Sequence, residues 1–384
     1  MFAIIYLFEL WIACMSQPYR QTRARILLTN LRDNAKQLKS YIDQQPMLGV
    51  IKADGYGHGA TEVAHAIADY VEKYAVAFID EAIALREAGI TKPIVILQGL
   101  YSTEDWLICA EQHFEPVIHN AQQIDFLTQV TADTRCVNVW LKQDSGMHRL
   151  GFFIDDVPTA VKRLREHPLV NDIVLMTHFA EADDPESPMT PMQLERFYAA
   201  LHAVHEQIQG VSVANSAFML GDDVLDAMGL TKWFRAGIAL YGQNPSQAEL
   251  SDAELLKPTM VLEAPVIALR TIQAGETVGY GSRWRAQRES LIATLAIGYA
   301  DGYPRSVPDG TPVIINDQVG CLVGRISMDM ITVDVTDIEG VKLGDNVELW
   351  GERLPIQVIA DQARTITYEL FAQVTRRVPR RYED

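Results

Sequence analysis

Residues 137–179 read VNVWLKQDSGMHRLGFFIDDVPTAVKRLREHPLVNDIVLMTHF, and this stretch indicates the fold. It begins with an apolar run at 137–144, continues through a loop and a helical pattern at 157–167, and ends in a second apolar run at 173–179. Continuous apolar runs are typical of strands buried on both faces, and helices between them connect parallel strands. The stretch therefore predicts one strand–helix–strand unit of a parallel sheet.

The same alternation extends outward from this unit over most of the chain. The other apolar runs are LGVIKA (48–53), YAVAFI (74–79), PIVILQG (93–99), FEPVIHN (114–120), VSVANS (211–216) and FRAGIALYG (234–242), with helical stretches between them. Eight such runs over roughly 220 residues match the strand number and length of a TIM (β/α)8 barrel. A doubly wound open sheet shares this alternation and is the alternative fold.

The pattern changes after about residue 250. The segments 260–272, 290–300, 311–326, 329–336 and 345–351 are β-rich, with Gly, Asp and Pro between them. We therefore predict an α/β protein with two domains. A TIM barrel spans residues 15–251, and a mostly β domain spans 252–384 and ends in a short helix near 367–374.

The composition is that of a folded globular protein, with 48% hydrophobic and 22% charged residues. The net charge of −17 argues against nucleic acid or an anionic membrane as a partner, because their phosphates would be repelled. The four cysteines, Cys14, Cys109, Cys136 and Cys321, lack metal-like spacing. We therefore expect no metal site and a reducing, cytoplasmic compartment.

The N-terminal residues 1–14, MFAIIYLFELWIAC, are apolar enough for a short signal core. They lack a basic region, contain Glu9, and are too short to span a membrane. Met15 then opens a polar start. We interpret residues 1–14 as an extension outside the fold, with export as the alternative.

Polar residues gather where the predicted strands end. They are Lys52 after the first run, Asp144 and Arg149 after the fifth, His178 at the end of the sixth, Asn215 and Ser216 at the end of the seventh, and Arg235 and Gly237 in the eighth. Barrel enzymes carry their chemistry at this end of the strands. The distribution predicts one site at the barrel mouth.

The expected chemistry of this site depends on a lysine and on a group of residues that can bind an anion. A desolvated lysine has a lowered pKa and can form a Schiff base, although Lys52 alone also fits a structural ion pair. His178 alone likewise fits a satisfied interior histidine. A serine hydroxyl, an arginine and a bare glycine amide near the last two strands favour phosphate. Lysine plus phosphate suggests pyridoxal phosphate, and a sugar-phosphate aldolase is the alternative.

Tyr280 stands between two glycines in ETVGYGSRW (276–284). A catalytic phenol would be exposed in this way, and a hairpin turn with an aromatic flank is the simpler alternative.

Together, these stretches resemble alanine racemase, a family with a pyridoxal-phosphate barrel followed by a β domain. The matching segments, in chain order, are VIKADGYGHG (50–59), QDSGMHRLG (143–151), THF (177–179), NSA (215–217), RAGIALYG (235–242), VGYGSRW (278–284), GYADGYPR (298–305), GRISMDM (324–330) and TYEL (367–370). The departures are Asp54-Gly55 where the family commonly has Asn-Ala, and Ser327 where it commonly has cysteine.

The resemblance implies that the enzyme interconverts L-alanine and D-alanine, for peptidoglycan supply or for D-alanine breakdown. Lys52 and Tyr280 would be the catalytic acid/bases, and Lys52 would also hold the cofactor as a Schiff base. Tyr56, Ser216, Tyr368 and the amides of Gly237 and Ile238 would bind the phosphate. Arg235 would face the pyridine nitrogen, and His178 would support both Arg235 and the catalytic phenol.

The resemblance also implies a substrate site and a partner. Arg149 and the amide of Met328 would bind the substrate carboxylate, and Asp183, Tyr299, Arg305 and Arg325 would line the access channel. Lys142 aligns with a lysine that some members carry as a carbamate. Tyr280 and Met328 would act across the interface of a homodimer.

Racemisation explains why two bases are expected. A proton leaves one face of Cα and returns to the other, which a single base does not easily serve. Lysine and tyrosine both have ordinary pKa values near 10, so both need tuning to work near neutral pH. The alternatives are an amino-acid racemase of broader range, a barrel-type decarboxylase, and a pyridoxal-phosphate-carrying regulatory protein without catalysis.

Overall fold

The computed structural model describes residues 20–130, 135–221, 225–245 and 256–384. Its contacts divide the chain into two compact units, one formed by Leu28–Lys257 and the other by Pro258–Asp384 together with the segment up to Leu27. The expected extension 1–14 and the alternative start Met15 lie outside the described residues.

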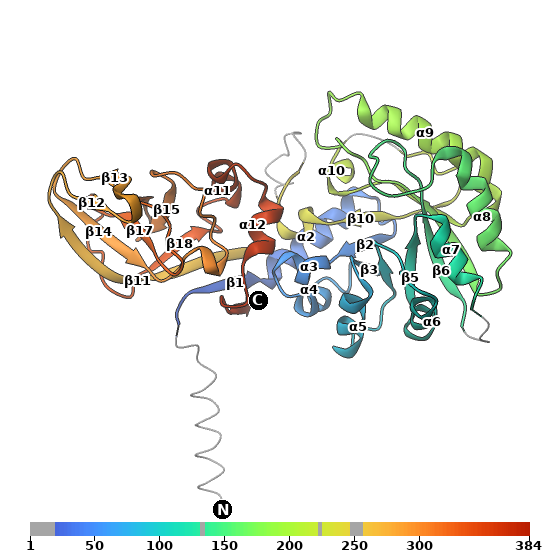
Figure 1. Ribbon diagram of the computed structural model, residues 1–384, viewed down its shortest axis with the longest axis horizontal. Helices are drawn as coiled ribbons and strands as arrows, with labels where there is room; N and C mark the ends of the chain where they lie inside the picture. The colour runs from blue at the N-terminus through green and yellow to red at the C-terminus, as the bar shows by residue number, and fades with distance from the viewer. Residues whose placement is uncertain (1–19, 131–134, 222–224, 246–255) are drawn as a thin grey trace, which may run out of the picture. The chain divides into compact units, whose positions relative to one another are not determined.

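The first unit is a parallel barrel (Figure 1). Its strands are β2 (Met47–Val50), β3 (Lys73–Val76), β4 (Ile94–Ile96), β5 (Phe114–Ile118), β6 (Val137–Lys142), β7 (Val170–Met176), β8 (Gly210–Ser212), β9 (Thr231–Lys232) and β10 (Phe234–Ala236). They pair in parallel in the order β10-β2-β3-β4-β5-β6-β7-β8-β9. β9 and β10 are two halves of one strand, interrupted at Trp233, so nine segments provide the eight predicted positions. The barrel is confirmed, and the open sheet is wrong, because β10 returns to pair with β2.

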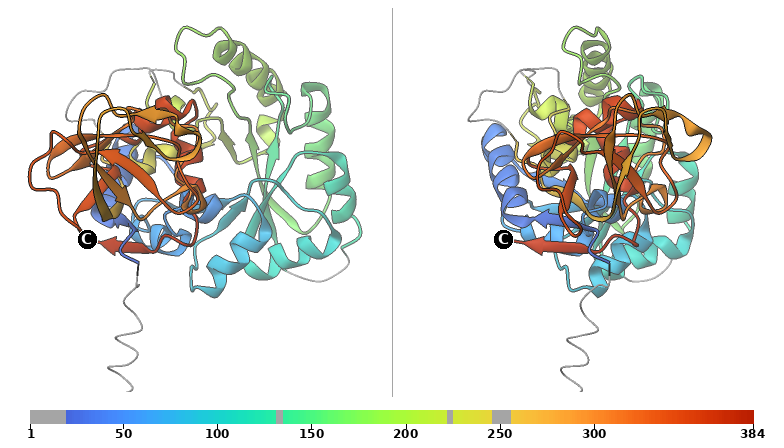
Figure 2. Two further views of the ribbon diagram at one scale, coloured as in Figure 1. Left: turned by 60° about the vertical axis from the view of Figure 1, so that its left-hand side comes forward. Right: turned by 90° about the vertical axis from the view of Figure 1, so that its left-hand side faces the viewer.

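Helices cover the outside of these strands (Figure 2, left). They are α2 (Leu28–Tyr41), α4 (Ala60–Ala66), α5 (Ile79–Glu87), α6 (Thr103–Gln112), α7 (Ala121–Leu127), α8 (Val157–Arg165) and α9 (Met189–Val204). Shorter turns at the strand ends are α3 (Lys52–Tyr56), α10 (Ser216–Met219), η1 (Ile154–Asp156), η2 (His205–Gln207) and η3 (Ile238–Tyr241).

Side-chain pattern and capping explain the helices. α8 buries Val157, Ala160, Val161 and Leu164, the i, i+3, i+4, i+7 spacing of one apolar face, and its basic residues lie in the last turn. Ser102 caps α6 by accepting the amide of Asp105 at 3.2 Å. The sequence thus gives α8 one apolar face for packing and gives α6 a defined start.

The second unit is a mostly antiparallel β domain. Its large sheet contains β1 (Arg23–Leu27), β11 (Met260–Ile272), β14 (Ser290–Leu295), β15 (Pro312–Ile315), β16 (Gln318–Leu322), β17 (Ile331–Asp334), β18 (Asn346–Trp350) and β19 (Arg380–Glu383). The order is β14-β17-β16-β15-β18-β11-β1-β19, and β14 also pairs with β11. A hairpin of β12 (Thr277–Val278) and β13 (Trp284–Arg285), the turns η5 (Tyr280–Ser282) and η6 (Tyr299–Asp301), and the helices α11 (Ile356–Ala363) and α12 (Thr367–Gln373) complete it. The mostly β character expected for this region is confirmed.

The first described strand belongs to this β domain. β1 pairs with β11 in antiparallel and with β19 in parallel orientation. The expected domain limits placed residues 15–27 with the barrel. The five residues of β1 alternate between half-buried and buried, a pattern that fits a strand of either unit. Their sequence therefore does not indicate which sheet they join.

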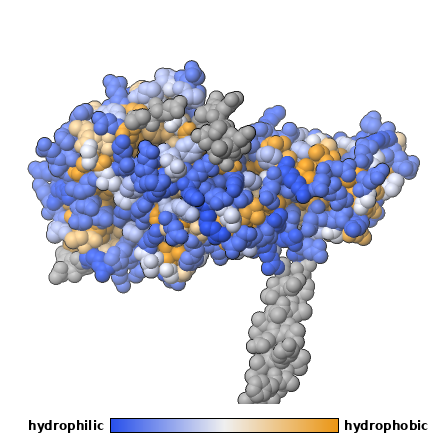
Figure 3. Space-filling model, turned by 180° about the vertical axis from the view of Figure 1, so that it is seen from behind, coloured by the Kyte–Doolittle hydropathy of each residue, from blue (hydrophilic) through white to orange (hydrophobic). Residues whose placement is uncertain are grey.

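The surface shown in Figure 3 is largely hydrophilic, with apolar residues in small groups between charged ones. Among the residues that the structure describes, no helix combines the length and apolar character needed to cross a lipid bilayer.

Candidate active site

Lys52 begins an unusual turn at the carboxyl end of β2. Residues 53–56 all have positive φ angles, between +52° and +61°, so the chain makes a left-handed turn directly after the lysine. A left-handed α conformation costs an L-residue roughly 1–2 kcal/mol, and glycine adopts it without this cost. Gly55 therefore eases one of the four positions, while Ala53, Asp54 and Tyr56 remain strained.

Hydrogen bonds hold the turn in place. The amide of Gly55 donates to the carbonyl of Ile51 at 2.9 Å, and the amide of Ala60 donates to Asp54 Oδ1 at 3.0 Å. The amide of Ala53 donates to Oε1 of Glu81, on α5, at 2.7 Å. The turn thus positions Lys52 and Tyr56 in the same local structure.

Lys52 is partly buried and lies in an electropositive environment. Burial, and then the charge of Arg149, lowers the pKa of Lys52, while Glu81 acts in the opposite direction. A lowered pKa increases the fraction of neutral amine, which is the nucleophilic form. Lys52 therefore has the character that the sequence predicted for a Schiff-base lysine.

The hydroxyl groups of Tyr56 and Ser216 lie close to Gly237. Ser216 Oγ accepts the amide of Gly237 at 2.9 Å. A Cβ built on Gly237 would lie 3.1 Å from the hydroxyl oxygen of Tyr56 and 3.7 Å from Ser216 Oγ. The amide of Ile238 follows at the start of η3. Hydroxyl and amide donors around a glycine fit a phosphate group, so these residues suit the phosphate of pyridoxal phosphate.

Arg235 extends from β10 and is held by five contacts. Nη1 donates to the carbonyl and hydroxyl oxygens of Ser212 at 3.0 and 2.7 Å. Nη2 contacts the carbonyls of Thr177 and Val213 at 2.9 and 3.2 Å, and Nδ1 of His178 at 3.1 Å. Burial lowers the pKa of Arg235 to about 10, so the guanidinium stays protonated at neutral pH. Nε is not used in these contacts, which leaves one donor for a ring nitrogen.

His178 is a neutral hydrogen-bond relay. Burial, and then the charge of Arg235, holds the pKa of His178 well below its usual range. The guanidinium of Arg235 can only donate, so Nδ1 of His178 accepts and Nε2 carries the proton. His178 can therefore donate a hydrogen bond to a phenol oxygen.

The loop after β6 carries Arg149. Asp144 Oδ1 accepts the amides of Gly146 and His148, each at 3.0 Å, and Oδ2 lies 3.2 Å from His148 Nδ1. Burial raises the pKa of Asp144, but these hydrogen bonds outweigh it and bring the pKa below its usual value. An ionised Asp144 thus shapes the loop that presents the exposed side chain of Arg149.

Lys142 lies at the end of β6, deeply buried among cations. Burial, and then the charges of Arg235 and Arg149, lowers the pKa of Lys142 to about 8. A substantial fraction of this amine is therefore neutral near physiological pH. Lys142 and Lys52 each affect the pKa of a neighbouring cation or of His178, so the structure brings these groups together at the barrel mouth.

Two polar residues outside the sequence prediction support the site. Gln193, on α9 and completely buried, donates to the carbonyl of His178 at 3.1 Å and accepts the amide of Ala180 at 2.9 Å. Glu81 accepts the amide next to Lys52. Gln193 lies 13 and 15 residues after the groups it contacts, and Glu81 lies 28 residues after Ala53, so both contacts depend on how the helices pack.

The remaining predicted residues belong to two other places. Asp183 is exposed in the loop between β7 and α9. Tyr280, Tyr299, Arg305, Arg325, Met328 and Tyr368 belong to the β unit, and of these Tyr368 alone is half-buried while the others are exposed. Tyr280 is 70% exposed and Met328 53%, which suits residues that meet a ligand or a partner.

Two loops of the β unit support each other. The amide of Tyr299 donates to the carbonyl of Ser327 at 3.1 Å, and the amide of Ala300 donates to that of Met328 at 3.0 Å. Buried Asp301 accepts the amide of Gly298 at 2.9 Å. The loops that carry the expected channel residue Tyr299 and the expected carboxylate-binding amide of Met328 are therefore fixed together.

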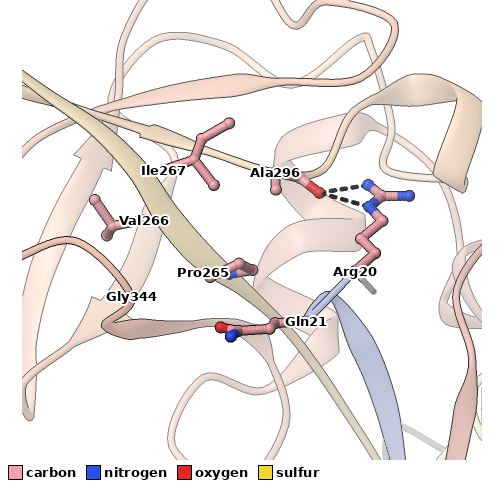
Figure 4. A pocket seen from close by; sticks show the side chains of 7 residues that line it. All are labelled: Arg20, Gln21, Pro265, Val266, Ile267, Ala296 and Gly344. Atoms are coloured by element: carbon pink, nitrogen blue, oxygen red, sulfur yellow. Dashed lines mark hydrogen bonds between the residues drawn. The ribbon is translucent and has the colours of Figure 1, made fainter. Parts of the chain in front are cut away.

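A surface groove of about 490 Å³ lies elsewhere in the β unit (Figure 4). It is lined by Arg20, Gln21, Pro265, Val266, Ile267, Ala296 and Gly344. Arg20 already pairs with Asp301 at 2.5 Å and donates to the carbonyl of Ala296 at 3.1 Å. The groove contains none of the predicted site residues and offers no nucleophile or base among its lining residues.

The family comparisons cover nearly the whole chain. Residues 26–245 match the family described as alanine racemase, N-terminal domain, and residues 259–382 match alanine racemase, C-terminal domain.

Individual relatives and a solved structure agree with these matches. An alanine racemase of Alteromonas mediterranea is 43% identical over 361 residues, 94% of this chain and 98% of the relative. A catabolic alanine racemase of Pseudomonas aeruginosa is 43% identical over 363 residues, 94% of this chain and 99% of the relative. The crystal structure of the biosynthetic alanine racemase from Pseudomonas aeruginosa superimposes with a TM-score of 0.87 at 40% identity, covering 95% of this chain and all of that chain.

Proposed function

The chain belongs to the alanine racemase family, and on that premise we propose that it interconverts L-alanine and D-alanine with pyridoxal 5'-phosphate as its cofactor. The observation that carries this proposal is the arrangement at the barrel mouth. A lysine with a lowered pKa, a neutral histidine bonded to a buried arginine, and hydroxyl groups beside Gly237 lie at the strand ends there.

When bound, pyridoxal phosphate makes the Cα–H of the attached amino acid acidic. Lys52 would hold the cofactor, while Tyr56, Ser216, Tyr368 and the amides of Gly237 and Ile238 would hold its phosphate. Arg235 would donate to the pyridine nitrogen. A cation at that position keeps the nitrogen unprotonated and weakens electron withdrawal, which would suppress transamination.

Lys52 and Tyr280 would act as the two acid/bases, one on each face of Cα. The lowered pKa of Lys52 supports its role as a base near neutral pH. The proton on Nε2 of His178 would stabilise the phenolate of Tyr280, with Arg235 fixing the tautomer through Nδ1.

The substrate carboxylate would bind Arg149 and the amide of Met328. Lys142 would face Arg149 as a carbamate, formed when its neutral amine bonds to the carbon of CO2 and releases a proton. The pKa of about 8 supports this modification because it requires the neutral amine. The resulting anion would offset the cations around it.

The proposed assembly is a homodimer in which Tyr280 and Met328 of each subunit act in the site of the other. Their exposure in the β unit supports this arrangement. Asp183, Tyr299, Arg305 and Arg325 would line the access channel. The cytoplasm is the proposed compartment, and the relatives include both biosynthetic and catabolic enzymes, so either role suits the activity.

Chiral chromatography in deuterated water tests the proposed function. The purified protein with pyridoxal phosphate should convert L-alanine into D-alanine that carries deuterium at Cα, and Lys52→Ala should abolish this conversion. A cofactor-loaded protein that leaves L-alanine optically pure and undeuterated would overturn the proposal.

A further inference from the structure

Glu81 joins two segments of the barrel mouth through three backbone amides. Its Oε1 accepts the amide of Ala53 at 2.7 Å, and its Oε2 accepts the amides of Ala77 and Phe78 at 2.7 and 3.1 Å. Ala77 and Phe78 follow β3, whereas Ala53 follows Lys52 after β2. One carboxylate therefore connects the ends of two neighbouring strands at the position where the chain leaves the barrel.

The segment that Glu81 holds is strained. Ala53 has φ +53° and begins a left-handed turn that continues through Tyr56, with φ +52°, to Gly57, with φ +77°. The amide of Ala53, at the start of this turn, finds its acceptor in the side chain of Glu81 on α5. A charged acceptor forms a stronger hydrogen bond than a neutral one, so Glu81 is suited to hold a conformation that alanine resists.

Glu81 is also a carboxylate whose charge acts on Lys52 among neighbouring cations. The charge of Arg149 lowers the pKa of Lys52, and the charge of Lys52 in turn helps to lower the pKa values of Lys142 and His178. The charge of Glu81 raises the pKa of Lys52 against the effects of burial and Arg149.

We propose that Glu81 is a positioning residue for the cofactor lysine: its carboxylate holds the left-handed turn that aims Lys52 and Tyr56, and its charge balances the cations around the amine. The inference rests on the proposed racemase function for its purpose. The geometry on which it depends is that of the protein alone.

Two measurements on the full chain test the proposal. The first is the dissociation constant of pyridoxal phosphate, obtained by titrating cofactor-depleted protein. The second is the pH midpoint of Lys52 acetylation by acetic anhydride in the same depleted protein, quantified by mass spectrometry of the lysine's peptide. The second measurement needs no cofactor, so it tests Glu81 even if the protein does not bind pyridoxal phosphate.

Glu81→Gln should change both quantities. Glutamine has one acceptor oxygen and no charge, so both strand-end segments lose a charged acceptor and one of them loses its acceptor altogether. The loss should raise the dissociation constant about ten- to hundredfold. Removal of the negative charge should also move the acetylation midpoint of Lys52 to lower pH.

Three further variants distinguish the charge of Glu81 from the length of its side chain and from the backbone strain at Ala53. Glu81→Asp keeps the charge but shortens the side chain, so it should weaken cofactor binding with a smaller shift of the midpoint. Ala53→Gly combined with Glu81→Gln should regain part of the affinity, because glycine adopts φ +53° without strain. Glu87→Gln, on the exposed side of the same helix, is the matched control and should change neither quantity.

The proposal is overturned if Glu81→Gln retains both the wild-type dissociation constant and the wild-type midpoint. If Glu81→Gln does not fold, Glu81→Asp is measured in its place. A wild-type dissociation constant for pyridoxal phosphate in Glu81→Asp would then overturn the proposal. A wild-type protein that binds no pyridoxal phosphate would refute the proposed function instead, while the acetylation midpoint still decides the role of Glu81.

Discussion

Replacing Gly237 by alanine tests the phosphate site directly. The new Cβ would lie 3.1 Å from the hydroxyl oxygen of Tyr56 and 3.9 Å from its Cζ. Tyr56 is 8% exposed and stacks on Tyr241 with ring centroids 4.7 Å apart. Tyr241 is itself buried and bonds to the carbonyl of Val50 at 3.1 Å. The tyrosine therefore has little room to move away, and the methyl group would occupy the space between the donors.

The magnitude follows from the hydrogen bonds that a displaced phosphate loses. One hydrogen bond to a charged group contributes about 1.5–3 kcal/mol, so the dissociation constant of pyridoxal phosphate should rise about ten- to 150-fold for each one lost. Titration of cofactor-depleted protein, followed by the visible absorbance of the bound cofactor, measures this constant.

Gly221→Ala is the matched control, because a Cβ at Gly221 meets its nearest neighbour at an ordinary 3.6 Å. Its dissociation constant should stay at the wild-type value, and thermal unfolding of both variants separates local from global effects. An unchanged affinity in Gly237→Ala, with the protein folded, would refute the assignment of the phosphate to this glycine.

Three further predictions concern single side chains. Arg235→Glu should increase pyruvate formation from alanine by transamination, and an unchanged rate of this side reaction would count against the role of the cation. The pKa of Lys142 is about 8 in the folded chain and 10.5 ordinarily, so the unfolded chain binds more protons between these pH values. In CO2-free buffer, the free energy of unfolding should therefore rise with pH in this window by up to about 3 kcal/mol, and denaturant titrations of Lys142→Met should lack that rise. Glu115 pairs with Lys73 at 2.7 Å at the opposite end of the barrel, so Glu115→Gln should lower the free energy of unfolding by about 3 kcal/mol in denaturant titrations. A loss of kcat without a loss of stability in Glu115→Gln would contradict its structural role.

The barrel was predictable because its strands are continuous apolar runs. The run at 137–144 becomes β6, and the run at 173–179 contributes the buried half of β7. The last strand was predictable in position but not in shape, since its two halves separate at Trp233. The period and length of an apolar run identify a strand. Whether that strand is interrupted depends on how it packs with residues that are distant in the sequence.

The site was predictable where the sequence itself places a reactive group at a strand end. Lys52 and His178 are of this kind, and burial is the largest cause of the lowered pKa of each. The left-handed turn after Lys52 was not predictable, because Ala53 and Tyr56 do not favour positive φ and Asp54 alone does not specify it. The supporting contact of Glu81 with the amide of Ala53 joins residues 28 positions apart and emerges only from the fold.

In the proposed homodimer, Lys52 and Tyr280 act as two bases on one alanine from two different subunits. Mixing the inactive variants Lys52→Ala and Tyr280→Phe under conditions that exchange subunits tests this arrangement. Random exchange makes half of the dimers mixed, and each mixed dimer has one site with both bases intact. Racemisation should therefore recover to about a quarter of the wild-type rate. A mixture that exchanges subunits but stays inactive would show that Lys52 and Tyr280 do not act together across the subunit interface.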